Sequence, residues 1–202
     1  MLKTVDEACD FIGEWCGESA AHAGTELTVP FAIPNSVARL NSRVGGLWRT
    51  AKRTPGPLLA YATPFLGLLA GQDRILDPSA YVIDAYGVVP FVCENQGVWR
   101  CGFDPNDTDR LLVSGDWSGG PSVDFSNHWR HVQATTEDAL VCALLINMCM
   151  QSETHWDQDA AKPGEACIPL WNHPAWNDLY DFWVNEEQTL IYFSGWRVTR
   201  RS

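Results

Sequence analysis

The sequence has little positive charge. Of its 202 residues, 14 are Lys or Arg and 25 are Asp or Glu, so the formal net charge is −11. A protein surface of this sign repels phosphate backbones and anionic lipid headgroups, and the basic groups near residues 49–53 and 197–201 are too small to offset it. We therefore expect a protein that binds neither nucleic acid nor a membrane surface.

A hydrophobic run long enough to span a membrane is also absent. The most apolar stretch, residues 57–71, is about 15 residues long and contains Pro64, whereas a spanning helix needs about 20 apolar residues. Residues 1–7 show no apolar segment behind a basic head, so no secretory signal is expected. These absences predict a cytoplasmic protein.

Metal and phosphate motifs are missing as well. The seven cysteines form no C-x-x-C pair, so we expect reduced, mostly buried thiols. His128 and His131 are three residues apart in a segment with loop or strand character, where their side chains point to opposite faces. Asp104, Asn106 and Asp109 resemble a calcium-loop fragment without its central Gly and closing Glu. No P-loop is present. We expect no metal and no cofactor.

Catalytic signatures are equally scarce. The chain has no G-x-S-x-G and no H-E-x-x-H motif. A cysteine hydrolase needs a thiolate, an imidazole and a carboxylate close together, and Cys93 beside Glu94, with a histidine, could supply them. No local nucleophile motif surrounds Cys93, however.

Apolar and aromatic side chains are abundant instead. Hydrophobic residues make up 46% of the chain, and ten residues are tryptophan. This composition predicts one globular domain over residues 1–202. We expect core or half-buried packing positions for Trp15, Trp48, Trp99 and Trp183. The tryptophans in Gly-, Pro- and Asp-rich loops are candidate binding anchors, namely Trp117, Trp129, Trp156, Trp171 and Trp176.

Helices are predicted in three places. Thr4 and Glu7 form a capping box before an amphipathic helix that Gly17 ends. A second helix starts at Pro34 and is stopped by Gly45-Gly46, and the sequence leaves open whether the two pack together. Residues 135–138 cap an apolar run over 139–150, which we expect to be the central core helix.

Strands are predicted between and after these helices. The segments rich in β-branched and aromatic residues are 81–86, 88–94, 97–103 and 111–113, with an acidic loop at 104–109 and a last hairpin from 182–184 and 189–193. The order predicts an α+β fold, with a central mixed or antiparallel sheet flanked by helices.

The middle of the chain resembles a known family. Residues 68–78, the segment Val89-Pro90-Phe91-Val92-Cys93-Glu94-Asn95-Gln96-Gly97-Val98-Trp99, and Asp104-Pro105 are similar to the SUKH superfamily of bacterial immunity proteins, which also includes fungal cell-wall assembly regulators. The elements at 33–46 and 129–150 match in order, so the resemblance covers roughly residues 30–195. The helical start at about residues 1–24 is an extension that the family does not require.

The resemblance implies a non-enzymatic, cytoplasmic α+β domain, with a monomer favoured, that blocks the active site of a cognate toxin such as a nuclease or deaminase. An acidic surface favours docking on a basic substrate groove. The candidate partner-binding residues are Glu94, Asn95, Gln96, Trp99, Asp104, Asp107, Asp109, Asp116, Trp117, Asp124 and Trp129. Of these, Glu94, Asn95 and Gln96 also suit a structural role in pinning a tight turn. An intracellular scaffold of the same fold and a small cysteine hydrolase are the alternatives.

Overall fold

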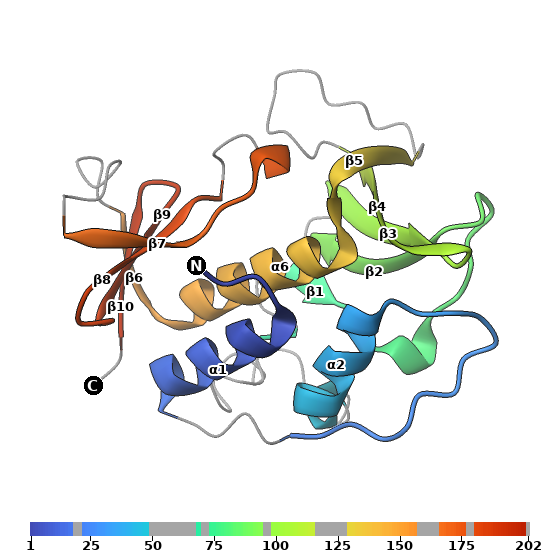
Figure 1. Cartoon of the computed structure of the whole chain (residues 1–202), viewed down its shortest axis with the longest axis horizontal. Coiled ribbons are helices and arrows are strands. Elements are labelled where there is room, and N and C mark those ends of the chain that lie inside the picture. Colours follow the sequence, from blue (N-terminus) through green and yellow to red (C-terminus); the bar gives the residue numbers. More distant parts are fainter. Residues whose placement is uncertain are drawn as a thin grey trace.

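The long helix α6 crosses the middle of the molecule, with one sheet at each end and two helices alongside (Figure 1). The computed structural model describes residues 1–17, 22–48, 68–69, 73–94, 98–115, 129–156, 166–176 and 180–200, with the side chains of all of these except 153–156 and 176.

Both N-terminal helices form as predicted. Helix α1 (Val5–Cys16) begins with the Thr4–Glu7 capping box and ends at Gly17 in the left-handed conformation. Helix α2 (Asn35–Val44) ends at Gly45, although the backbone is helical again over residues 46–48. The two helices contact each other and α6, because each has buried apolar residues on one face.

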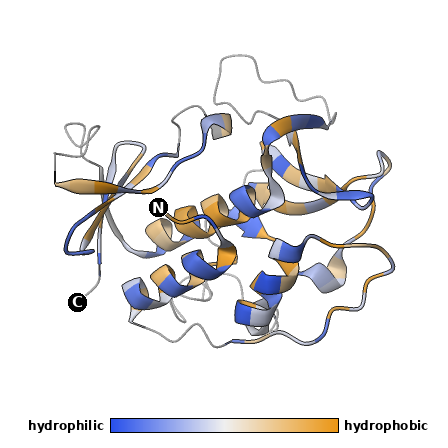
Figure 2. Cartoon of the chain, in the orientation of Figure 1, coloured by the Kyte–Doolittle hydropathy of each residue, from blue (hydrophilic) through white to orange (hydrophobic). Residues whose placement is uncertain are grey.

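Helix α6 (Thr136–Gln151) is confirmed as the central core helix. Thr135 caps it and Asp138 completes the predicted capping box. Twelve of its residues are buried, on all sides of the helix, so it must be covered from several directions. It contacts α1, α2, all strands of the first sheet and the first strand of the second sheet. Figure 2 shows α6 as a mostly hydrophobic helix, whereas α1 and α2 carry both kinds of surface.

The strands form two antiparallel sheets. The first has the order β1-β2-β3-β4-β5 and comprises β1 (Asp73–Ile75), β2 (Val89–Glu94), β3 (Trp99–Asp104), β4 (Asp107–Gly115) and β5 (Arg130–Thr135). The second has the order β6-β10-β9-β8-β7 and comprises β6 (Glu153–Trp156), β7 (Cys167–Trp171), β8 (Phe182–Asn185), β9 (Leu190–Phe193) and β10 (Trp196–Thr199). Two 3-10 helices, η1 (Pro78–Ala80) and η3 (Pro174–Trp176), lie in the connections.

The α+β class is therefore confirmed, with two sheets where one central sheet was expected. The predicted hairpin of residues 182–193 is part of the second sheet, and β6, β7 and β10 complete it. Two sheets form because α6 separates the strands along the chain and is apolar on more than one side. One continuous cluster of buried residues joins both sheets to the three helices.

Three local predictions need correction. Residues 81–86 are not a strand: Val82, Ile83 and Tyr86 are exposed, and the carboxylate of Asp84 accepts hydrogen bonds from the backbone of Tyr86 and Val88, which favours a turn. The predicted loop 104–109 is a two-residue turn, with Asp107 and Asp109 already on β4. Trp171, expected in a loop, is buried in β7 against Phe182.

In the parts of the chain that the structure describes, no helix has the length and apolar character needed to cross a membrane.

Candidate functional site

An open cleft lies where the two sheets meet along α6, and we refer to it as the inter-sheet cleft. Its volume is about 320 Å³. It is lined by Asp73, Glu94, Val98, Trp99, Ile146, Met150, Tyr180, Phe193, Ser194 and Trp196. The first sheet supplies one wall and residues 180–196 supply the other, so distant parts of the chain build it.

Two predicted partner residues, Glu94 and Trp99, meet in this cleft. Glu94 ends β2 and Trp99 begins β3. The carboxylate of Glu94 accepts a hydrogen bond from the backbone N–H of Val98 at 3.2 Å. Glu94 therefore satisfies a neighbouring backbone N–H, as its position at the end of a strand suggested, while it also lines the cleft. Asn95 and Gln96 lie outside the described residues.

Asp73 is the most unusual group in the cleft. It lies directly opposite Glu94 in the antiparallel pairing of β1 and β2 and is only 2% exposed. Burial, and then the negative charge of Glu94, raise the pKa of Asp73 to about 7. Within the described part of the chain, no hydrogen bond reaches its carboxylate. An ionised Asp73 is thus costly until a partner satisfies it.

Asn147 holds Asp73 in place. Its side-chain oxygen accepts the backbone N–H of Asp73 at 2.8 Å, and its amide donates to the carbonyl oxygens of Asp73 and Leu68, both at 2.7 Å. Sequence reasoning missed both residues. The available signal was that Asn147 is the only strongly polar side chain in the apolar run 139–150.

Aromatic side chains form the rest of the cleft wall. Trp99, Tyr180 and Trp196 are half-buried and all line the cleft. Burial, and then the charges of Cys142, Asp73 and Glu94, raise the pKa of Tyr180 to about 12, so its hydroxyl keeps its proton. The cleft therefore combines carboxyl groups with neutral aromatic faces.

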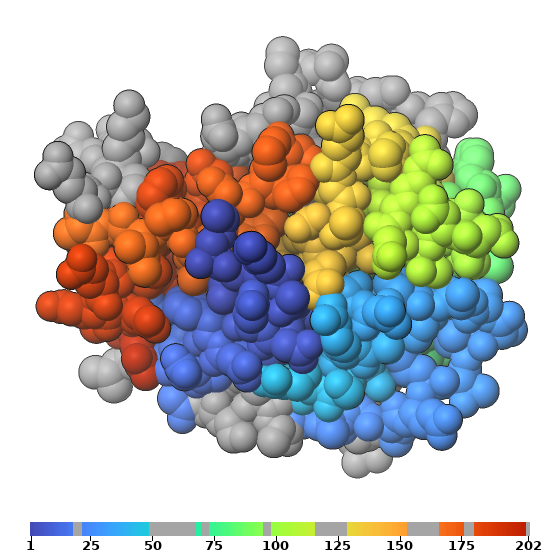
Figure 3. All heavy atoms as spheres, in the orientation of Figure 1, coloured from blue at the N-terminus to red at the C-terminus, as the bar shows by residue number. Residues whose placement is uncertain are grey.

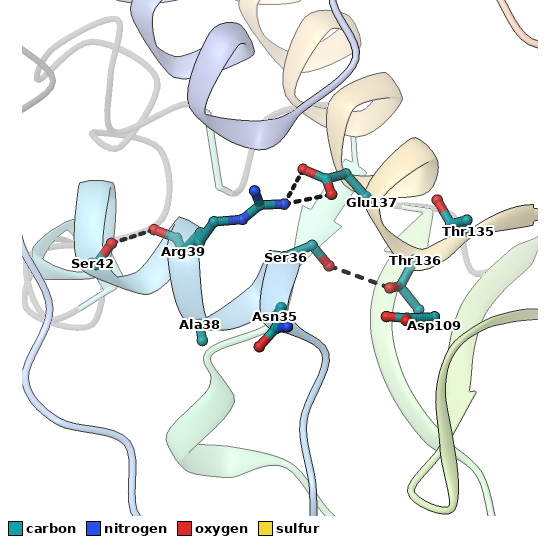
Figure 4. A pocket seen from close by; sticks show the side chains of 9 residues that line it. All are labelled: Asn35, Ser36, Ala38, Arg39, Ser42, Asp109, Thr135, Thr136 and Glu137. Atoms are coloured by element: carbon teal, nitrogen blue, oxygen red, sulfur yellow. Dashed lines mark hydrogen bonds and ion pairs between the residues drawn. The ribbon is translucent and has the colours of Figure 1, made fainter.

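A second hollow, the α2–α6 depression, lies where these two helices begin (Figure 4). Its volume is about 650 Å³ and its lining is polar. It is lined by Asn35, Ser36, Ala38, Arg39, Ser42, Asp109, Thr135, Thr136 and Glu137. Ser36 and Thr136 share a hydrogen bond of 3.2 Å, which joins the first turns of α2 and α6.

Glu137 is the polar junction of the three helices. Arg39 donates from one nitrogen to both of its carboxylate oxygens, and the backbone N–H of Val5 donates to one of them at 2.8 Å. Arg39 also lies 3.7 Å from Asp6. Arg39, the one arginine among the described residues that line the depression, is therefore paired within the protein, and the acidic Asp109 also lines the depression.

The predicted aspartates of the β3–β4 hairpin have different positions. Asp104 accepts the backbone N–H of Asn106 at 2.8 Å and so shapes the two-residue turn. Asp107 and Asp109 are exposed near the start of β4, where the pairing with β3 is irregular. Asp109 lines the α2–α6 depression, and Asp107 lies two residues nearer the turn. Asp116, Trp117 and Asp124 lie outside the described residues.

Trp129 lies on the outer face of the first sheet, away from both hollows. Its indole N–H donates to the carboxylate of Asp84 at 2.7 Å, and the guanidinium of Arg100 stacks 5.4 Å from its ring centre. An added Cβ on Gly102 would come within 3.0 Å of the Trp129 ring, so the ring lies against the backbone there. Trp129 is half-buried and joins the 81–88 loop to the sheet.

The cysteine-hydrolase alternative rests on Cys93, which is half-buried between Arg74 and Arg100 on neighbouring strands. Burial raises the pKa of the Cys93 thiol even though both arginines act to lower it. A catalytic cysteine needs the opposite shift, because the thiolate is the nucleophile.

All seven cysteines are free, and Cys9, Cys101, Cys142 and Cys149 are buried, as expected for reduced thiols. The side chain of His173 lies 3.6 Å from Asp138, whereas His128 is outside the described residues. Among the side chains that are described, no three His, Cys, Asp or Glu residues are grouped so as to hold a metal ion.

Comparisons of the chain with protein families, curated proteins and solved structures find no match. The function is therefore inferred from the residues of the two hollows and from the sequence resemblance.

Proposed function

We propose that the chain is a non-enzymatic immunity protein that binds a cognate bacterial toxin, such as a nuclease or deaminase, and neutralises it by stoichiometric blocking of its active site. The observation that carries the proposal is the acidic edge of the β3–β4 hairpin beside the α2–α6 depression. Asp107 and Asp109 are exposed there on β4 of the first sheet. A hollow next to fixed carboxylates suits a protrusion at the rim of a basic groove.

The position of this edge supports docking over catalysis. The backbone of Asp107 pairs with Asp104 across the two-residue turn, and Asp109 follows it on β4. Little conformational entropy is lost when such preorganised groups bind. Figure 3 shows α1, α2, β4 and the start of α6 side by side on one face, so the depression opens on a broad surface.

The raised pKa of Cys93 favours the binding function over the hydrolase alternative. With a net charge of −11, the whole protein would also attract a basic toxin from a distance.

The experiment is co-expression of the chain with candidate toxins, followed by rescue of growth and co-purification. In the double variant Asp107→Lys and Asp109→Lys we expect toxin affinity to fall by about tenfold or more, mostly through slower association, and the salt dependence of association to weaken. Glu186→Lys with Glu187→Lys is the matched control, because these exposed glutamates lie in the β8–β9 turn of the other sheet.

An equal loss in both double variants would assign the effect to net charge alone. Unchanged affinity and salt dependence in the hairpin variant would place the docking surface elsewhere, and failure of every toxin to bind would contradict the function.

A further inference from the structure

We propose that the inter-sheet cleft is a recognition pocket for one cationic side chain, an arginine or lysine of the bound protein, with Asp73 and Glu94 as its charge partners and Trp99, Tyr180 and Trp196 as its aromatic walls. The identity of the bound protein as a toxin rests on the proposed function. The preference of the cleft for a cation rests on the cleft itself.

The carboxylate of Asp73 has no hydrogen-bond partner among the described residues. Asp73 is 2% exposed, lines the cleft, and receives no hydrogen bond on its carboxylate from the described residues. Asn147 accepts one hydrogen bond from the backbone of Asp73 and donates two, to the carbonyl oxygens of Asp73 and Leu68, so the backbone that carries the carboxylate is held in place. Buried polar groups in native proteins nearly always have a partner, so a carboxyl held in place without one points to a ligand that supplies it.

The charged side chains that are described in the cleft wall are both acidic. Among the lining residues that the structure describes, two are acids and none is Lys, Arg or His. The other titratable groups that face Asp73 are Cys101 on β3, Cys142 on α6 and Tyr180, and burial raises the pKa of all three, so they remain neutral. A positively charged group would balance an ionised Asp73, and the carboxylate of Glu94, which lies opposite Asp73 on β2, adds to the attraction.

Aromatic and apolar side chains form the walls of the cleft. The faces of indole and phenol rings carry negative electrostatic potential and attract ammonium and guanidinium groups, more strongly when water is excluded. Ile146 and Met150 of α6 add apolar surface suited to the methylene stem of a long side chain. At about 320 Å³ the cleft is at the lower end of the size range of ligand pockets and has room for one long side chain.

The test uses the full chain and two small probes, N-acetyl-arginine amide and the matched citrulline amide, which has nearly the same shape but no charge. Binding is followed by NMR shifts of the indole N–H signals, assigned with Trp99→Phe and Trp196→Phe. We expect the arginine probe to shift these two signals and the citrulline probe to leave them unchanged. Asp73→Asn and Glu94→Gln should each weaken binding by about tenfold, whereas the exposed Glu187→Gln should not.

The pH dependence provides a second readout. Because a cation favours the ionised form of Asp73, affinity should rise between pH 6 and pH 8 in the wild type and stay flat in Asp73→Asn. Equal shifts with the citrulline probe, or unchanged binding in Asp73→Asn, would overturn the inference.

Failure of this inference and failure of the proposed function give different results. A toxin that is neutralised equally by wild type and Asp73→Asn leaves the proposed function intact and removes the cleft from it. Arginine-specific binding in the cleft without neutralisation of any toxin supports the cation pocket and contradicts the toxin as its source.

Discussion

At the scale of single residues, a few polar groups are fixed inside apolar surroundings. Asp73 and Asn147 are buried at 2% and 0% exposure, in a region where β1 meets the apolar helix α6. The side-chain amide of Asn147 makes its hydrogen bonds with the backbone of Leu68 and Asp73, whereas the Asp73 carboxyl lines the cleft. The amide of Asn147 thus holds Asp73 in a position where ionisation of its carboxyl group lowers the stability of the folded protein.

Asp73 makes the stability of the protein depend on pH. Its pKa is about 7 in the folded protein and near 3.8 when unfolded, so between these values the folded state holds a proton that the unfolded state has lost. The free energy of unfolding must therefore decrease as pH rises through this range. We expect wild type to lose about 3 kcal/mol relative to Asp73→Asn between pH 5 and pH 8.

Urea unfolding of both proteins at the two pH values measures this difference. Asp107→Asn is the control, since it makes the same change at an exposed site and should follow the wild type. A stability difference between wild type and Asp73→Asn that does not vary with pH would show that the carboxyl titrates normally.

At the scale of elements, the three helices are joined through Glu137. It accepts the first backbone N–H of α1 and pairs with Arg39 of α2, from the first turn of α6. Packing of apolar side chains sets the crossing angles of the helices, and these directional, charge-assisted bonds add a specific connection between the helix ends.

A double-mutant cycle separates the two roles of Glu137. Arg39 is 39% exposed at its side chain, so the coupling between Arg39→Ala and Glu137→Gln should be modest, at about 1 kcal/mol, and should decrease with added salt. Glu137→Ala should be less stable than Glu137→Gln, because only the latter keeps an acceptor for Val5. Thermal unfolding at low and high salt gives these values; equal stabilities of the two Glu137 variants would exclude the role in capping α1.

At the scale of the whole molecule, both sheets share one core. Residues of α1, α6 and both sheets belong to a single buried cluster, and the backbone N–H of Leu2 donates to Leu170 of the second sheet at 2.7 Å. The N-terminal helix that the sequence marked as an extension is part of this cluster. The inter-sheet cleft depends on the same arrangement, since its walls come from both sheets.

This shared core predicts one cooperative unfolding transition. Val198→Ala, a change at a fully buried site of β10, should lower the free energy of unfolding by about 2 kcal/mol without splitting the transition. Circular dichroism and tryptophan fluorescence recorded over a urea series should coincide in reducing buffer. Two separate transitions, of which only one responds to Val198→Ala, would indicate that the sheets are independent units.

The sequence alone was sufficient where the deciding interactions are local. The capping boxes at Thr4 and Thr135 predicted both helix starts, because their hydrogen bonds span three residues. The apolar run 139–150 predicted a helix covered on several sides. Alternation and turn residues predicted β2, β3 and the β8–β9 hairpin. The strand predicted at residues 81–86 was wrong, because the carboxylate of Asp84 accepts hydrogen bonds from the local backbone and favours a turn.

Only the tertiary structure decided which distant residues meet. Sequence motifs identified Glu94 and Trp99, but the position of Asp73 opposite Glu94 follows from the register of β1 against β2. The contact of Asn147 with Asp73, and the entry of Tyr180 and Trp196 into the cleft, depend on how α6 and the second sheet pack. Register and packing are set by long-range burial, which no short segment encodes. The chain thus determines its elements locally, while the cleft exists only because two sheets cover one helix.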